Sequence, residues 1–173
     1  YQAYGEYPVK VPADAGYGSF DNYKFCKEHG IELFMKYNTY AKEKEPINDK
    51  NRFKNYRMKP DEKGKIICPA GHEFEFEREY QHADGVYERS NKLYRNHNCE
   101  NCPLRSKCTK AKNGRTLIVS DELLGFQNEV KQNLSTDDGK ELMKQRSIQA
   151  EGIFGQLKQD KEYDRLWRRG LSN

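Results

Sequence analysis

Between residues 9 and 37, the alternation of apolar and polar residues predicts a strand, a helix and a second strand. Val9 and Val11 flank a lysine, which is typical of a short strand. A glycine turn follows, and residues 20–29 (FDNYKFCKEH) then have helical character before Gly30. Residues 31–37 (IELFMKY) are apolar enough for a mostly buried strand. The order strand, helix, strand within thirty residues is typical of an α/β sheet.

The next region, roughly residues 38–115, does not continue the alternation of strand and helix and is rich in lysine, asparagine and glutamate. Phe74 and Phe76 alternate with glutamates, which predicts a half-exposed strand. Residues 65–68 (KIIC) are expected to pair with it as a hairpin across a Pro-Ala-Gly turn. Few other apolar residues are available for burial, so we expect something other than a hydrophobic core to stabilise this region.

The last region returns to regular structure. Residues 116–120 (TLIVS) predict a strand, residues 121–134 a helix, and residues 135–160 a long helix with an apolar stripe. Glu151 and Lys158 fall beside that stripe. These patterns predict an α/β core that is interrupted by an insertion, with the divisions 1–40 (core), 41–115 (cysteine-rich insertion) and 116–173 (core with the long helix).

Composition narrows the class of protein. Charged residues make up 34% of the chain and the mean hydropathy is −1.15, so the apolar runs are too short to span a membrane. With no leader-like pattern, the chain is expected to be soluble and cytoplasmic. A net charge of +4 permits contact with DNA but does not require it. Twelve tyrosines and eight phenylalanines are expected to supply much of the core, since aliphatic residues are sparse.

Two acidic residues, 137 positions apart, stand in distinctive surroundings. Asp14 follows the first strand, and Glu151 lies on the long helix between Ala150 and Gly152, with Lys158 seven residues further on. Carboxylates delivered from a strand end and a distant helix can hold a divalent metal for phosphoryl transfer. The alternatives are that Asp14 is an ordinary turn residue and that Glu151 is a solvated charge.

Three stretches carry a family resemblance: ADAGYGSFDNY (13–23), RSIQAEGIFGQLK (146–158) and YDRLWRRGL (163–171). With the cysteine-bearing segment between them, they resemble the DDE transposases of bacterial insertion sequences. The branch with a cysteine-containing insert between the second and third catalytic acids is the most similar. The resemblance implies a ribonuclease H-like fold, with Asp14 as the second catalytic carboxylate, Glu151 as the third and Lys158 as the basic residue that follows.

The same resemblance implies a function and its cofactors. Transposases of this family cleave DNA and transfer strands using Mg²⁺ or Mn²⁺, which Asp14 and Glu151 would help to bind. The partners would be transposon ends and target DNA, and the full-length protein would be a possible homodimer. The family's first catalytic aspartate belongs on an earlier strand, and only Glu6 precedes Asp14 here as an acid. We therefore expect a fragment of a catalytic domain that is inactive alone. The alternative is a non-catalytic zinc-binding module that contacts DNA or protein.

The cysteines form a second group of candidate functional residues. Cys68, Cys99, Cys102 and Cys108 all lie in the predicted insertion, where four thiolates can close a tetrahedral zinc site. His72 is the alternative ligand. An iron–sulphur cluster or free thiols are also compatible with this spacing. Cys26 is expected on the apolar side of its helix, in the core.

A third group of candidate functional residues is cationic. Arg165, Arg168 and Arg169 surround Trp167 and are suited to phosphate contact and base stacking. Arg146 lies near the position where related families keep an arginine, so it joins Lys158 among the candidate DNA contacts. An exposed surface with ordinary salt bridges explains the three C-terminal arginines equally well.

Overall fold

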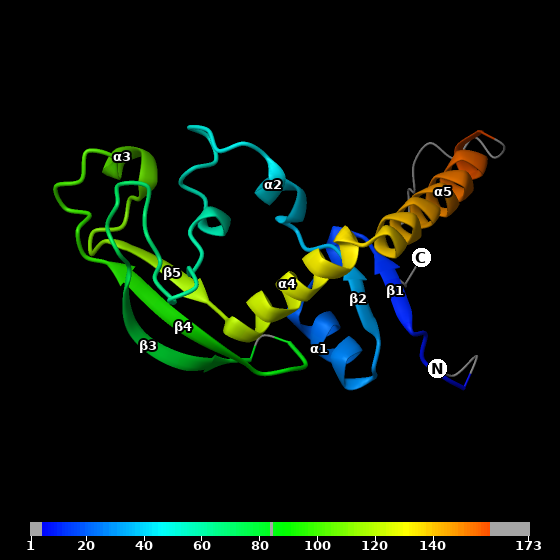
Figure 1. Cartoon of the computed structure of the whole chain (residues 1–173). Coiled ribbons are helices and arrows are strands. Elements are labelled where there is room, and N and C mark those ends of the chain that lie inside the picture. The colour runs from blue at the N-terminus through cyan, green and yellow to red at the C-terminus, as the bar shows by residue number, and fades with distance from the viewer. Residues whose placement is uncertain (1–4, 84, 160–173) are drawn as a thin grey trace, which may run out of the picture.

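The structure is a computed structural model that describes residues 5–83 and 85–159, the last ten of them by their backbone (Figure 1). Two separate sheets and several helices make up this part of the chain. In chain order the elements are β1 (Lys10–Ala13), α1 (Phe20–Glu28), β2 (Glu32–Met35), α2 (Tyr40–Lys44), β3 (Glu75–His82), β4 (Arg89–Asn96), α3 (Arg105–Cys108), β5 (Arg115–Val119), α4 (Asp121–Ser135) and α5 (Asp137–Gln159); 3₁₀ turns occur at Ala15–Tyr17 and Asn55–Arg57.

The first sheet contains β1 and β2, which are parallel and connected by α1. Val11 lies opposite Leu33 in this pair. Helix α1 begins after Ser19, whose hydroxyl accepts a hydrogen bond from the backbone N–H of Asn22 at 3.3 Å. The predicted order of strand, helix and strand is therefore confirmed, and the chain has a mixed α/β fold.

The second sheet is antiparallel, with the order β3-β4-β5. The predicted hairpin of residues 65–68 across the Pro-Ala-Gly turn is confirmed in a short form, because Ile67 bridges Glu73 and the N–H of Cys68 donates to the carbonyl of His72 at 2.9 Å. From Glu75 onwards, β3 pairs with β4. Strand β5 pairs with β4. The predicted boundary at residue 115 thus separates β5 from the two strands with which it forms a sheet.

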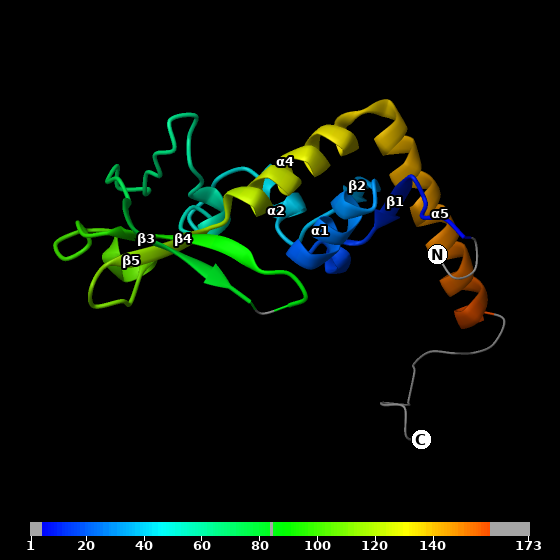
Figure 2. The same ribbon diagram turned by 90° about the horizontal axis from the view of Figure 1, so that it is seen from below.

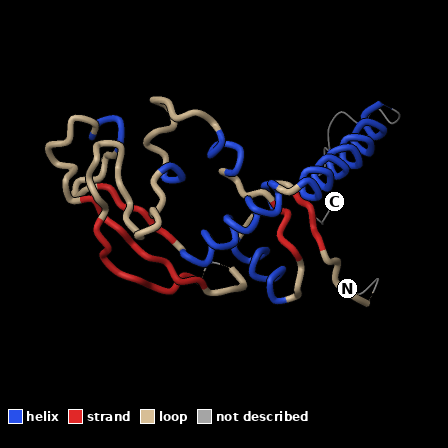
Figure 3. The backbone as a smooth tube through the Cα atoms, viewed as in Figure 1, coloured by secondary structure: helices blue, strands red, loops and turns tan. Residues whose placement is uncertain are grey.

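Helix α4 connects the two sheets. In Figure 3, the antiparallel sheet and the parallel pair lie at opposite ends of the described chain, with α4 between them. Helix α4 contacts β2 and α5, and it also contacts β4. Figure 2 shows α5 beside β1, where its N-terminal half follows the strand.

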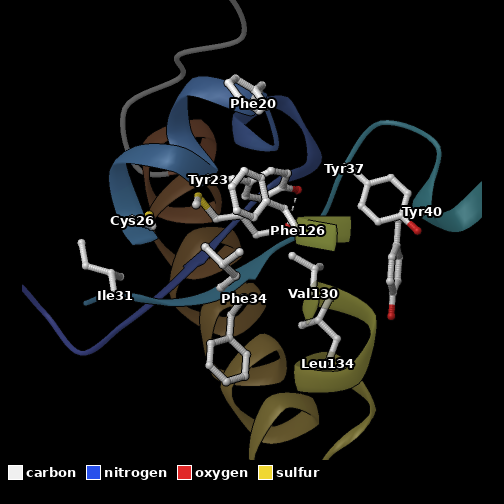
Figure 4. Packing of buried hydrophobic residues seen from close by; sticks show 12 residues of the cluster. Phe20, Tyr23, Cys26, Ile31, Phe34, Tyr37, Tyr40, Phe126, Val130 and Leu134 are labelled. Atoms are coloured by element: carbon white, nitrogen blue, oxygen red, sulfur yellow. Dashed lines mark hydrogen bonds between the residues drawn. The ribbon is translucent and has the colours of Figure 1, made fainter. Parts of the chain in front are cut away.

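The larger hydrophobic core lies between α1, β2 and α4 (Figure 4). Half of its twelve buried residues are aromatic, which confirms the expectation drawn from composition. Tyr23 is fully buried, and its hydroxyl donates to the backbone carbonyl of Met35 at 2.9 Å. Cys26 also lies in this core as predicted, where burial raises the pKa of its thiol. The core residues are Phe20, Tyr23, Cys26, Ile31, Leu33, Phe34, Met35, Tyr37, Tyr40, Phe126, Val130 and Leu134.

A second, smaller core lies against β5. Met58, Ile66 and Phe74 pack there with Leu117 and Val119. The expectation that the middle region lacks a hydrophobic core was therefore wrong, because three isolated apolar residues converge on the inner face of one strand. Within the described chain, every helix is too short or too polar to cross a bilayer.

Candidate active site

Asp14 lies immediately after β1, at the carboxyl end of the strand. Its backbone is extended, and the 3₁₀ turn Ala15–Tyr17 follows it. The side chain makes no capping hydrogen bond to that turn and is 63% exposed. Gly18 completes the turn against the end of β2, since a Cβ there would overlap the carbonyl of Lys36. The turn is thus formed by the backbone and a glycine, and the Asp14 carboxylate is available for another partner.

That partner is Arg146 of α5, whose guanidinium forms an ion pair with the Asp14 carboxylate. The two residues are 132 positions apart in sequence. A second ion pair joins the same elements, because Lys10 of β1 contacts Asp138 of α5 at 2.5 Å. The two contacts align α5 along β1 (Figure 2) and place Asp14 against the helix that carries the other candidate residues.

Glu151 and Lys158 both belong to α5, whose backbone remains helical as far as Gln159. Glu151 lies five residues after Arg146, which is a displacement of about 7.5 Å along a helix axis. The side chains of Glu151 and Lys158 are not among the described ones, so the separation of the two candidate carboxylates stays a prediction. Residues Arg165, Arg168 and Arg169 lie outside the described residues.

The cysteine-rich segment contains a small enclosed cavity. Its volume is about 20 Å³, and its walls include all five candidate metal ligands: Cys68, His72, Cys99, Cys102 and Cys108. The cysteines are free of disulfide bonds. Among the described residues, however, no three His, Cys, Asp or Glu side chains lie close enough to hold a metal ion. The predicted ligands therefore share a cavity but do not form an assembled metal site in this structure.

Arg115 of β5 closes one side of this cavity and is itself buried. One guanidinium nitrogen, Nη1, donates to the carbonyl of Cys108 at 3.2 Å and approaches its Sγ at 3.0 Å. The other, Nη2, donates to the carbonyl of Phe53 at 2.5 Å and to Oδ1 of Asn55 at 2.6 Å. Arg115 thereby ties β5 to α3 and to the loop before β3. A cation surrounded by carbonyls needs such contacts to compensate for lost solvation.

A family model described as "Transposase DDE domain" matches residues 67–173, which is more than half of the chain. The chain belongs to this transposase family. The resemblance seen in the sequence is thus confirmed at the level of the family, whereas the cysteine-containing branch stays a prediction. The matched range includes Arg146, Glu151 and Lys158, and Asp14 precedes it. No curated protein and no solved structure matches the chain.

Sequence patterns gave no indication of one charged cluster in this transposase domain. Glu43 of α2 has a side chain that is only 12% exposed, and it accepts hydrogen bonds from Lys59 at 2.7 Å, Thr39 at 2.9 Å and Tyr37 at 3.0 Å. Lys131 of α4 completes the cluster at 3.0 Å. Burial raises the pKa of Glu43, but the hydrogen bonds from Lys59, Lys131 and Thr39 outweigh burial and lower it overall. The cluster joins the middle region to the α/β core.

Proposed function

We propose that this chain contributes to the catalytic domain of a DNA transposase, with a ribonuclease H-like core that carries Asp14 and Glu151 as catalytic carboxylates. The reaction would be cleavage and transfer of DNA phosphodiester strands. One observation carries the proposal: Asp14, at the end of a parallel strand, contacts α5, the helix that holds Glu151 and Lys158. Parallel strands deliver side chains to a crevice beyond their carboxyl ends, where α/β proteins bind ligands.

The donor set suits Mg²⁺ or Mn²⁺. Both cations prefer oxygen ligands such as carboxylates, and the Asp14 carboxylate is largely exposed and thus accessible to one. When bound, a divalent cation would supply a water or hydroxyl of lowered pKa and stabilise charge on the leaving oxygen. Asp14 and Glu151 would hold it, while Lys158 would contact the phosphate. Arg146 neutralises Asp14 in the present arrangement, so a cation must compete with the guanidinium for the same carboxylate.

Manganese binding tests this assignment without requiring activity. In polypeptide 1–173 labelled with ¹⁵N, substoichiometric Mn²⁺ should broaden amide signals at the end of β1 and along α5. Asp14→Asn should remove the broadening, because Asp14 supplies one of the proposed ligands. Asp138→Asn is the matched control, since Asp138 is equally exposed at 64% and also bridges β1 and α5. Broadening that persists in Asp14→Asn, or that is lost only in Asp138→Asn, would contradict the assignment.

A non-catalytic zinc-binding module is the second candidate function. The observation that favours it is the single small cavity shared by Cys68, Cys99, Cys102 and Cys108, with His72 beside them. A volume of about 20 Å³ is close to that of one bound water or ion. Zinc binding would have to draw the thiols together, and the buried Arg115 guanidinium would offset part of the negative charge of four thiolates.

Elemental analysis addresses the zinc proposal. Tag-free protein should contain about one zinc per chain, and Cys99→Ser combined with Cys102→Ser should remove it, because a closed tetrahedral site needs four ligands. Chelation should lower the melting temperature, since structural zinc contributes to folding. Cys26→Ala is the control, because Cys26 lies in the other core. Metal-free protein whose melting curve is unchanged by chelation would contradict the proposal. Zinc without any manganese effect at Asp14 would favour the non-catalytic module.

A further inference from the structure

An open groove with a volume of about 780 Å³ lies on the middle region of the chain. Three segments that are distant in sequence form its walls: the loop 49–56, helix α3 and the start of β5. The lining residues are Asp49, Lys50, Phe53, Lys54, Asn55, Tyr56, Lys107, Cys108 and Arg115. We refer to this feature as the basic groove, because four of these side chains are cationic and one is a carboxylate.

The walls of the basic groove are held in place by Arg115. Its two guanidinium nitrogens bind the backbone carbonyls of Phe53 and Cys108, so one buried side chain connects the loop, α3 and β5. The side-chain oxygen of Asn55 accepts a further hydrogen bond from it. With both nitrogens engaged, Arg115 holds the walls of the groove together.

The three lysines in the lining have no carboxylate partner among the described residues. Lys50, Lys54 and Lys107 are exposed, and none forms an ion pair within residues 5–83 and 85–159. Asp49 is the only carboxylate in the lining, and it pairs with Arg52 at 3.4 Å. Many other lysines of the chain do have carboxylate partners: Lys10, Lys24, Lys27, Lys59, Lys65 and Lys92. The groove therefore concentrates free positive charge on one face of the molecule.

We propose that the basic groove binds the sugar–phosphate backbone of double-stranded DNA. Lysine ammonium groups contact phosphates as point charges, and three of them around one open groove suit a polyanion rather than a single small anion. Such contacts position a duplex without reading its sequence. The groove would anchor DNA whose strands are processed near Asp14, so this role rests on the proposed function.

Charge removal tests the groove. Binding of a labelled 30-base-pair duplex of random sequence is measured against salt concentration for the wild type and for the combined variant Lys50→Gln, Lys54→Gln, Lys107→Gln. We expect an affinity at least about tenfold lower at 0.1 M salt, and a slope of log affinity against log salt that is smaller by about 2 to 3, because each lost phosphate contact removes close to one released counterion. The control, Lys42→Gln, Lys63→Gln and Lys144→Gln, removes the same charge from exposed lysines outside the lining.

Two outcomes would overturn the proposal. One is a duplex affinity and salt slope in the groove variant that equal those of the control. The other is unchanged duplex binding together with weaker binding of polyglutamate, which would assign the groove to an acidic protein partner. Manganese broadening at Asp14 should be the same in the groove variant and in the wild type, so failure of the groove and failure of the proposed catalytic site give different results.

Discussion

Polypeptide 1–173 should leave supercoiled plasmid uncut in Mg²⁺ or Mn²⁺, although it should retard DNA in gels at low salt. Cleavage by this chemistry requires metal ions held by three carboxylates. Asp14 and Glu151 are assigned as the second and third of these, and no residue of the polypeptide is assigned as the first. Arg146 also forms an ion pair with the Asp14 carboxylate, so a metal ion must compete with its guanidinium. Loss of one preorganised charge typically slows an enzyme by about 10²–10³-fold, which would place nicking below detection. Binding needs only cations and should fade towards physiological salt.

The outcome that contradicts this expectation is nicking by the wild-type polypeptide that disappears in Glu151→Gln. Glu141→Gln serves as the control, because Glu141 is an exposed acid on the same helix. Such a result would mean that another acid, for example Glu6 or one from the middle region, completes the site.

Replacement of Glu43 by glutamine should lower the free energy of unfolding by about 2 to 3 kcal/mol, because Lys59 and Lys131 would lose the carboxylate that compensates their charges. For a chain of this length the melting temperature should fall by about 5 to 10 °C. Chemical denaturation at neutral pH measures the change. Glu62→Gln is the control, since Glu62 is exposed and should change stability by less than about 0.5 kcal/mol.

The effect of Glu43 should also depend on pH. Its pKa in the folded chain lies below the ordinary value of 4.5, so its contribution is complete above pH 4.5 and is lost as the pH falls through the folded pKa. The difference in stability between the wild type and Glu43→Gln should therefore shrink on acidification below about pH 4.5. A difference that stays constant from pH 7 to pH 3 would show that the ionised carboxylate does not stabilise the cluster.

Some features followed from the sequence because they depend on neighbouring residues. The alternation at Val9 and Val11, the helical residues that end at Gly30 and the apolar run from residue 31 are local signals, and the structure confirms the strand, helix and strand that they predict. The abundance of aromatic residues likewise predicted a ring-rich core, because a chain poor in aliphatic side chains has few other groups to bury. Two of the stretches that carry the resemblance to DDE transposases, residues 146–158 and 163–171, lie within the range that the family model matches.

Other features were decided only by the tertiary structure, because they depend on contacts between distant residues. The antiparallel sheet is one, because β3, β4 and β5 come from separate segments and no local signal selects their partners. The contact of Asp14 with Arg146 is another, because it joins a strand end to a helix that follows 132 positions later and is brought to β1 by the packing of α4 on β2. The clusters around Glu43 and Arg115 are of the same kind. Each brings together residues from three segments of the chain. Charged residues that the sequence alone suggests are solvated are therefore buried and paired, or line a groove, only in the folded molecule.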